Sequence, residues 1–322
     1  CEARVRVGLN MKGAKRRDIK AQAGKKSNKG AAKKTKNAKR PGRNERARGE
    51  KAARDEAPRR KLSAKERLMG ARFRMLNEEL YRSSSEDNQT LFEKDPEAFA
   101  AYHQGFRAQV QRWDQHPAMM MVSKLKDICK MKIHRDKPEP LTVVDLGCGE
   151  ALIAKEIYRD SPANQDQGDS LDVRQKQFKG KGKKKTQPKK PIVIRSFDLV
   201  ADNEYAEVGN IAALNLESNS QDVAIFSLSL MGNDHPLFIQ EAARILKKDT
   251  GIMLVSEVGS RITSQKMFVK MVEGYGFKLD TTPRDMNYFV FFEFKRTDAE
   301  DTVPDEQTIA AGRLGICEYK PR

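Results

Sequence analysis

The sequence predicts an α/β fold with a mostly parallel sheet and helices on both of its faces. From Leu141 onward, short apolar segments alternate with amphipathic segments that look helical. The strand-like segments are apolar along most of their length, which is typical of strands buried on both faces of a parallel sheet. A Gly-Cys-Gly turn also separates the first strand-like segment from the helix-like segment that follows it.

The predicted elements follow one another through the C-terminal part of the chain. Four apolar segments are expected to be strands: 141–146, 191–199, part of 220–231, and 251–258. Three segments with helical spacing are expected to be helices: 151–158, 235–248 and 264–277. The strand-like segments 277–282 and 287–295 come last. They can form a hairpin that places an antiparallel strand in the sheet.

Ahead of the first strand, residues 63–135 are expected to form a small helical subdomain. Ser63 to Glu66 fits a capping box that opens a helix. A break is expected at 83–85, and Asp95-Pro96 then caps a second helix, whose aromatic run continues to Trp113. Because these aromatic residues recur at helical spacing, most of them are assigned to a core.

The positive charge is concentrated in two segments. Residues 1–67 hold 25 Lys or Arg and 7 Asp or Glu, whereas the rest of the chain is close to neutral. Residues 1–62 contain few large apolar side chains, and they are expected to be a disordered tail. Residues 159–191 are basic as well, and they are expected to be a disordered insertion in the domain 136–322. Such polycations bind nucleic acid by releasing counterions, and 25–40 is typical of a nuclear or nucleolar address.

Two other classes of protein are disfavoured by the sequence. The four cysteines form no Cys-x-x-Cys pair, so neither a zinc site nor a disulfide framework is expected. The sequence also has no run of about 18 apolar residues, which a membrane-spanning helix would need.

The glycine turn in "VVDLGCGEALIAK" (143–155) indicates a ligand that approaches the backbone closely. A dinucleotide site would need a third glycine where Leu152 stands, and a P-loop would need Gly-Lys followed by Ser or Thr. S-adenosylmethionine remains, and it needs an acid for its ribose at the end of the next strand. Asp198 is that acid, because it lies 16 residues after Gly149 once the expected insertion is set aside. The pattern therefore favours a methyltransferase.

Several longer blocks make the reading more specific. They are "RFRMLNEELYRSSS" (72–85), "AYHQGFRAQVQRW" (101–113), "DVAIFSLSLMGND" (222–234), "SEVGSR" (256–261) and "CEYKPR" (317–322). Together with the glycine turn, these blocks resemble the ribosomal RNA-processing protein 8 (nucleomethylin) family. The resemblance implies a Rossmann-like methyltransferase with a mostly parallel seven-stranded sheet. It also implies a nucleolar enzyme that uses S-adenosylmethionine to methylate N1 of an adenine in large-subunit ribosomal RNA, in ribosome biogenesis.

The resemblance also implies which residues bind the cofactor: His103, Gly147, Asp198, Asn210, Ile211 and Ser227. Asn210 departs from the family, which usually has Asp at this place. An Asn can still accept a hydrogen bond from the amino group of an adenine. Cys148 lies between two glycines, and its position and small size explain it without a role as a nucleophile.

The target adenine is expected to contact the segment that follows the fourth strand: Ser229, Leu230, Met231, Gly232 and Asn233. N1 of adenine is neutral with a free lone pair, so no catalytic base is expected, although Glu150 or Glu257 could assist. Two alternatives stay open. One is a methyltransferase acting on a protein or small molecule. The other is a non-catalytic ribosome-assembly or chromatin factor that retains the cofactor pocket.

Overall fold

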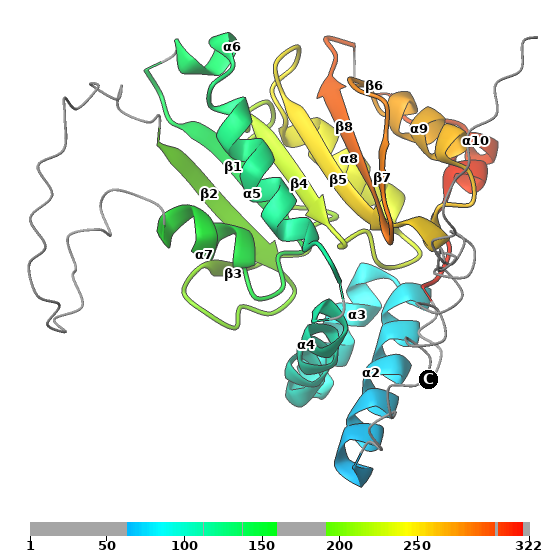
Figure 1. Cartoon of the computed structure of the whole chain (residues 1–322). Coiled ribbons are helices and arrows are strands. Elements are labelled where there is room, and N and C mark those ends of the chain that lie inside the picture. The colour runs from blue at the N-terminus through cyan, green and yellow to red at the C-terminus, as the bar shows by residue number, and fades with distance from the viewer. Residues whose placement is uncertain (1–62, 112, 137, 160–190, 300–301, 318–322) are drawn as a thin grey trace, which may run out of the picture. The chain divides into compact units, whose positions relative to one another are not determined.

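Figure 1 shows the chain as a computed structural model, which describes residues 63–111, 113–136, 138–159, 191–299 and 302–317. The tail expected at 1–62, with its address at 25–40, lies outside the described residues. So does the expected insertion, apart from its end residues Arg159 and Pro191. None of the helices in the described ranges combines the length and the apolar character that crossing a membrane requires.

An eight-stranded sheet organises the described residues. Its strands are β1 (Leu141–Leu146), β2 (Ile192–Asp198), β3 (Ala206–Val208), β4 (Val223–Ser227), β5 (Ile252–Val258), β6 (Phe277–Leu279), β7 (Arg284–Met286) and β8 (Phe289–Arg296). Seven of them follow the order β3-β2-β1-β4-β5-β8-β6. The pairs among β1 to β5 are all parallel. The predicted α/β fold with a mostly parallel sheet is therefore confirmed.

The C-terminal strands depart from the parallel pattern. Strand β8 runs antiparallel to β5, and β6 and β7 both pair with β8 in antiparallel register. The two last strand-like segments therefore pair as predicted. The expected number of strands was seven, and the short β7 in the connection between β6 and β8 is the eighth.

Helices precede the sheet and connect its strands. They are α2 (Ala64–Arg82), α3 (Ser85–Lys94), α4 (Pro96–Val110), α5 (Pro117–Ile128), α6 (Lys132–Arg135), α7 (Leu152–Arg159), α8 (His235–Ile245), η2 (Gly259–Arg261), α9 (Gln265–Gly274) and α10 (Glu306–Gly312). The sequence predicted the helices at 151–158, 235–248 and 264–277. It did not predict α5 or α10, and α4 ends at Val110, so that Trp113 lies beyond the helix.

Two apolar clusters cover the two faces of the sheet. Helices α5 and α7 pack on one face, where Val143 of β1 is buried. Helices α8 and α9 pack on the other face, where the next residue, Val144, is buried. This alternation is the two-residue period of a strand whose faces are both covered. Within the range 63–135, helix α5 thus belongs to a layer of the sheet.

Helices α2, α3 and α4 lie at the carboxyl ends of the parallel strands (Figure 1). The capping box at Ser63 and Glu66 is present, as is the Asp95 cap of α4. Where only a break was predicted, α3 begins, because Ser84 and Asp87 form a second capping box. A small apolar cluster joins α2 and α4 to residues that follow the strands, such as Leu199 after β2.

Candidate functional site

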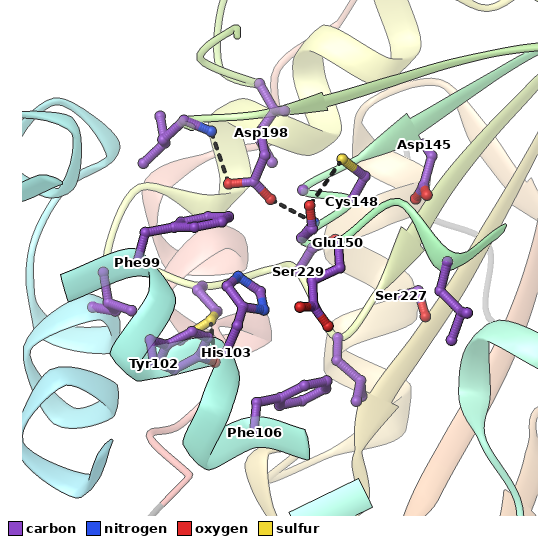
Figure 2. Close-up of a pocket in the computed structure, with 18 of the residues that line it drawn as sticks. Phe99, Tyr102, His103, Phe106, Asp145, Cys148, Glu150, Asp198, Ser227 and Ser229 are labelled. Atoms are coloured by element: carbon purple, nitrogen blue, oxygen red, sulfur yellow. Dashed lines mark hydrogen bonds between the residues drawn. The ribbon is translucent and has the colours of Figure 1, made fainter. Parts of the chain in front are cut away.

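A cavity of about 500 Å³ lies where the carboxyl ends of β1, β2 and β4 meet helices α3 and α4. Figure 2 shows many of the side chains that line it. The strand order reverses here, because β2 lies on one side of β1 and β4 on the other. Open α/β sheets bind their ligands in the crevice at such a point. The fold therefore places this cavity where a ligand is expected.

The turn after β1 forms one wall of the cavity. Gly147 and Gly149 have φ angles of +74° and +56°, in the left-handed region that favours glycine. A Cβ atom on Gly147 would lie 2.5 Å from Cβ of Ser229, and one on Gly149 would lie 2.7 Å from Cε1 of His103. Glycine is therefore required by both the backbone conformation and the close approach of other residues.

Asp198, the last residue of β2, stabilises this turn (Figure 2). Its Oδ2 accepts a hydrogen bond from the N–H of Gly149 at 2.7 Å, and its Oδ1 accepts one from the N–H of Leu199 at 2.8 Å. Burial raises its pKa to about 6, although these backbone donors favour the charged form. A carboxylate has about four acceptor positions, so Asp198 can also accept from hydroxyl groups of a ligand.

Asp145 is a second carboxyl group in the wall, and the sequence reasoning did not assign it a role. It lies on β1 just before the glycine turn and is only 1% exposed. Within the described residues its buried Oδ1 has no hydrogen-bond partner. Burial and the nearby charge of Asp198 raise its pKa to about 7. A buried acid with an unpartnered oxygen fits a cationic or hydrogen-bonding ligand.

Helix α4 covers the turn with aromatic side chains (Figure 2). The His103 ring lies 4.3 Å from the ring of Phe99 and 5.2 Å from that of Tyr102, between centroids. Burial, reinforced by the charge of Arg107, lowers the pKa of His103 to about 4, so its imidazole is neutral. Phe99, Tyr102 and Phe106 were assigned to a core from their spacing. Phe99 is buried, but all three also line the cavity.

Asn210 and Ile211 lie at the part of the cavity that faces α3. The Oδ1 of Asn210 accepts from the N–H of Ala212, and its Nδ2 donates to Oγ of Ser85 at 3.1 Å. Ser85 in turn donates from its N–H and its hydroxyl to Oδ2 of Asp234. This hydrogen-bond chain connects the loop after β3 to the start of α3. Ser85 also lines the cavity, and no pattern in the sequence indicated that position.

The segment proposed for the target base divides into two sets. Ser229 and Met231 line the cavity, as does Ser227 at the end of β4. Leu230 is fully buried and donates its N–H to Glu257, while Gly232 packs against the backbone of Ser83. The carbonyl oxygen of Asn233 accepts a hydrogen bond from Nη1 of Arg313. The cavity wall therefore does not include Leu230, Gly232 or Asn233.

Three further groups singled out in the sequence have distinct environments. Glu150 lines the cavity and forms an ion pair with Arg107 of α4. Glu257 lies outside the cavity wall and is fully buried in a pair with Arg261, with 2.6 Å between oxygen and nitrogen. Burial raises the pKa of the Cys148 thiol far above its usual range, which disfavours a thiolate nucleophile.

The chain is similar to proteins of one family. A family described as "Hypothetical methyltransferase" matches residues 59–177 and 179–322. "Ribosomal RNA-processing protein 8" of Caenorhabditis briggsae is 36% identical over 80% of this chain and 64% of its own length. The protein of the same name from Rattus norvegicus is 34% identical over 80% of this chain and 47% of its own length.

A third relative carries a more specific name. The "25S rRNA (adenine(645)-N(1))-methyltransferase" of Schizosaccharomyces pombe is 32% identical over 80% of this chain and 71% of its own length. The chain thus spans between about half and two thirds of the length of the two relatives above, and somewhat more of this one.

Proposed function

This chain belongs to the methyltransferase family that includes the ribosomal RNA-processing proteins 8, and on that premise we propose that it methylates N1 of an adenine in large-subunit ribosomal RNA. The methyl donor is S-adenosylmethionine. The observation that carries the proposal is the cavity in which Gly147, Gly149 and Asp198 meet beneath His103.

The residues present fit S-adenosylmethionine, which supplies an electrophilic methyl group when bound. The glycine turn gives a ligand access to the backbone, because a Cβ at either glycine would meet another side chain. The carboxylates of Asp145 and Asp198 suit a ligand that carries positive charge and ribose hydroxyls. Asn210 and Ile211 are assigned to the adenine of the cofactor, His103 to the cover of the turn, and Ser227 to the end nearest the reacting group.

The chemistry of N1 determines what the protein must supply. N1 of adenine has a free lone pair at neutral pH, so the reaction needs alignment and exclusion of water more than a general base. The rings of Tyr102 and Phe106, together with Ser229 and Met231, line the same cavity and can position the base. The methylated base is cationic, and aromatic faces stabilise a cation.

The RNA must present the target base outside a duplex. N1 lies on the Watson–Crick edge, so the adenine has to be unpaired or flipped out of the stack. The basic residues of 1–67 and of 159–191 would hold the phosphate backbone of ribosomal RNA or of a pre-ribosome through charge alone. From this partner and the address-like segment at 25–40 we infer that the protein acts in the nucleus and the nucleolus.

A methylation assay with purified components tests the proposal. The chain is incubated with methyl-labelled S-adenosylmethionine and large-subunit ribosomal RNA, and the RNA is digested to nucleosides at neutral pH. The label is expected in 1-methyladenosine with the wild-type chain and, at cofactor concentrations below saturation, at a level several-fold lower with Asp198→Asn. Asp249→Asn is the matched control, since Asp249 is an exposed acid in the turn between α8 and β5.

Other outcomes would contradict the proposal in different ways. Label in a different nucleoside would contradict the target atom. Binding of S-adenosylhomocysteine without any transfer to RNA would favour the alternative of a non-catalytic assembly factor that retains the pocket.

A further inference from the structure

A second cavity, of about 280 Å³, lies between the start of α5 and the turn that joins β7 to β8. Trp113, Asp114 and Gln115 line it on one side. On the other side it is lined by the segment from Asp285 to Phe289. Its volume is just below the range of about 300 to 1,000 Å³ that is typical of sites for drug-sized ligands. It is therefore of a size for a small planar group.

Aromatic rings connect this cavity to the first one. Phe106, which lines the first cavity, contacts Trp113 edge to face with 5.6 Å between ring centroids. Trp113 contacts Phe289 in the same manner at 4.7 Å. Because Phe289 pairs with Val258 at the carboxyl end of β5, both cavities open at the same edge of the sheet. The two cavities are thus neighbours, joined by the rings of Phe106, Trp113 and Phe289.

The lining of the second cavity combines ring faces with carboxylates. Tyr288 is 49% exposed, Trp113 is half-buried, and both flank the buried ring of Phe289. Asp114 and Asp285 are exposed acids in the same wall. Among the described residues that line it there is no Lys or Arg. This composition is unsuited to a phosphate group and suited to a nucleobase, which stacks on aromatic rings and donates N–H bonds from its edge.

We propose that the cavity between Trp113 and Tyr288 binds a second unpaired base of the RNA, a guanine, close to the adenine that is modified. Guanine presents two adjacent N–H donors, on N1 and N2, which a single carboxylate can accept together. Uracil has only one N–H donor, so the acids favour guanine over uracil. The proposal rests on the RNA substrate proposed above, but base binding here requires no methyl transfer.

Trp113 provides the readout, because it is the only tryptophan in the chain. The full chain is first saturated with S-adenosylhomocysteine, so that nucleosides are kept out of the cofactor part of the first cavity, and the variants below separate binding at Trp113 from binding at the target-base part. Guanosine, adenosine, cytidine and uridine are then titrated, and the tryptophan fluorescence is followed. Guanosine is expected to quench the fluorescence with an affinity about tenfold higher than that of uridine. The reason is that guanine can donate two hydrogen bonds to a carboxylate, whereas uracil can donate only one. Equal affinities for guanosine and uridine, or no quenching by any nucleoside, would overturn the proposal.

Four variants locate the site. Tyr288→Ala removes an exposed ring at a turn, and it is expected to lower the affinity for guanosine about fivefold or more. Tyr288→Phe keeps the ring and should keep the affinity. Asp114→Asn and Asp285→Asn remove one charge each, and at least one of them is expected to lower the affinity for guanosine about tenfold. Asp249→Asn is the matched control for charge and should bind as the wild type does.

The variants also separate this proposal from the proposed function. Wild-type affinity in Tyr288→Ala, or in both Asp114→Asn and Asp285→Asn, would contradict the assignment of the site. A chain that binds guanosine in this manner but transfers no methyl group would leave the base site intact and remove the proposed function alone.

Discussion

The Oδ2 atom of Asp198 accepts a hydrogen bond from the N–H of Gly149 at 2.7 Å, so the end of β2 holds the turn that follows β1. The same carboxylate is the acid proposed to bind the cofactor ribose. Asp198 therefore has two tasks, to keep a left-handed turn in place and to accept from a ligand. The two tasks are separable by experiment, because one affects stability and the other affects affinity.

Replacing Asp198 with Asn tests the second task, the binding of the cofactor. Asn keeps the shape of the side chain, but its amide group would face a backbone N–H that needs an acceptor. We expect the affinity for S-adenosylhomocysteine, measured by calorimetry, to fall at least about tenfold, because charge-assisted hydrogen bonds are lost. The control Asp249→Asn should leave the affinity unchanged. An affinity in Asp198→Asn equal to that of the wild type would refute the ribose assignment.

Much of the sheet and the turn could be predicted from the sequence for a physical reason. Strands buried on both faces must be apolar throughout, so β1, β4 and β5 stand out. Gly147 and Gly149 indicate that other groups approach the backbone closely, which a larger residue at either position would block. Asp198 could be predicted because the expected insertion lies between Gly149 and this residue. Once the insertion is set aside, the remaining distance along the chain fits a turn, a helix and a strand.

The features that were missed depend on partners far away in the chain. Helix α3 is polar, and it begins at Ser85 with Ser84 as its cap, whereas both residues were interpreted as part of a break. Ser85 owes its place in the cavity wall to Asp234, with which it forms two hydrogen bonds. Leu230 was expected at the target base, but it is buried, with its N–H bonded to Glu257. A local pattern does not reveal such tertiary contacts.

Cofactor affinity should depend on pH through the two buried acids. Burial raises the pKa values of Asp145 and Asp198 to about 7 and about 6, so the free protein gains protons at these groups as the pH falls. A cationic ligand favours the charged carboxylates. Its affinity should therefore be nearly full at pH 8, begin to decrease toward pH 7 and decrease further toward pH 6, by at most about tenfold per unit for each coupled proton.

Calorimetry with S-adenosylmethionine at pH 8, 7 and 6 measures this dependence. His103, with its pKa lowered to about 4, stays neutral over the range and should not contribute. Asp145→Asn should flatten the profile between pH 8 and 7. Equal slopes for this variant and the wild type would show that Asp145 is not the coupled group.

The contact between Gly149 and His103 predicts an energetic coupling. In Gly149→Ala the new Cβ would lie 2.7 Å from Cε1 of His103. Overpacking and the left-handed backbone should together lower the free energy of unfolding by about 2 to 4 kcal/mol. His103→Ala removes the clash, so the double variant should be more stable than the sum of the single effects by about 1 kcal/mol or more. Urea denaturation of the four proteins measures the cycle, and strict additivity would contradict the contact.

The hydrogen bond from Asn210 to Ser85 predicts that the residue usual in the family would be unfavourable here. Asn210→Asp removes the donor and places a second acid near Asp234, because Ser85 already donates to that carboxylate. We expect the free energy of unfolding at pH 8 to fall by about 1 to 3 kcal/mol. Asn219→Asp, in an exposed turn, serves as the control and should change stability little. A stability for Asn210→Asp within error of the wild type would contradict the proposed hydrogen-bond chain.

Primer extension on large-subunit ribosomal RNA tests the central claim most directly, because methylation of N1 blocks base pairing and stops reverse transcriptase. The RNA is taken from cells whose sole copy is the wild-type chain or Gly147→Arg, at matched protein levels. Gly147→Arg would force a long side chain into the turn, where even a Cβ meets Ser229. A stop at one adenine with the wild type, absent with Gly147→Arg, is the predicted result. A stop of equal strength in both RNAs would contradict the account.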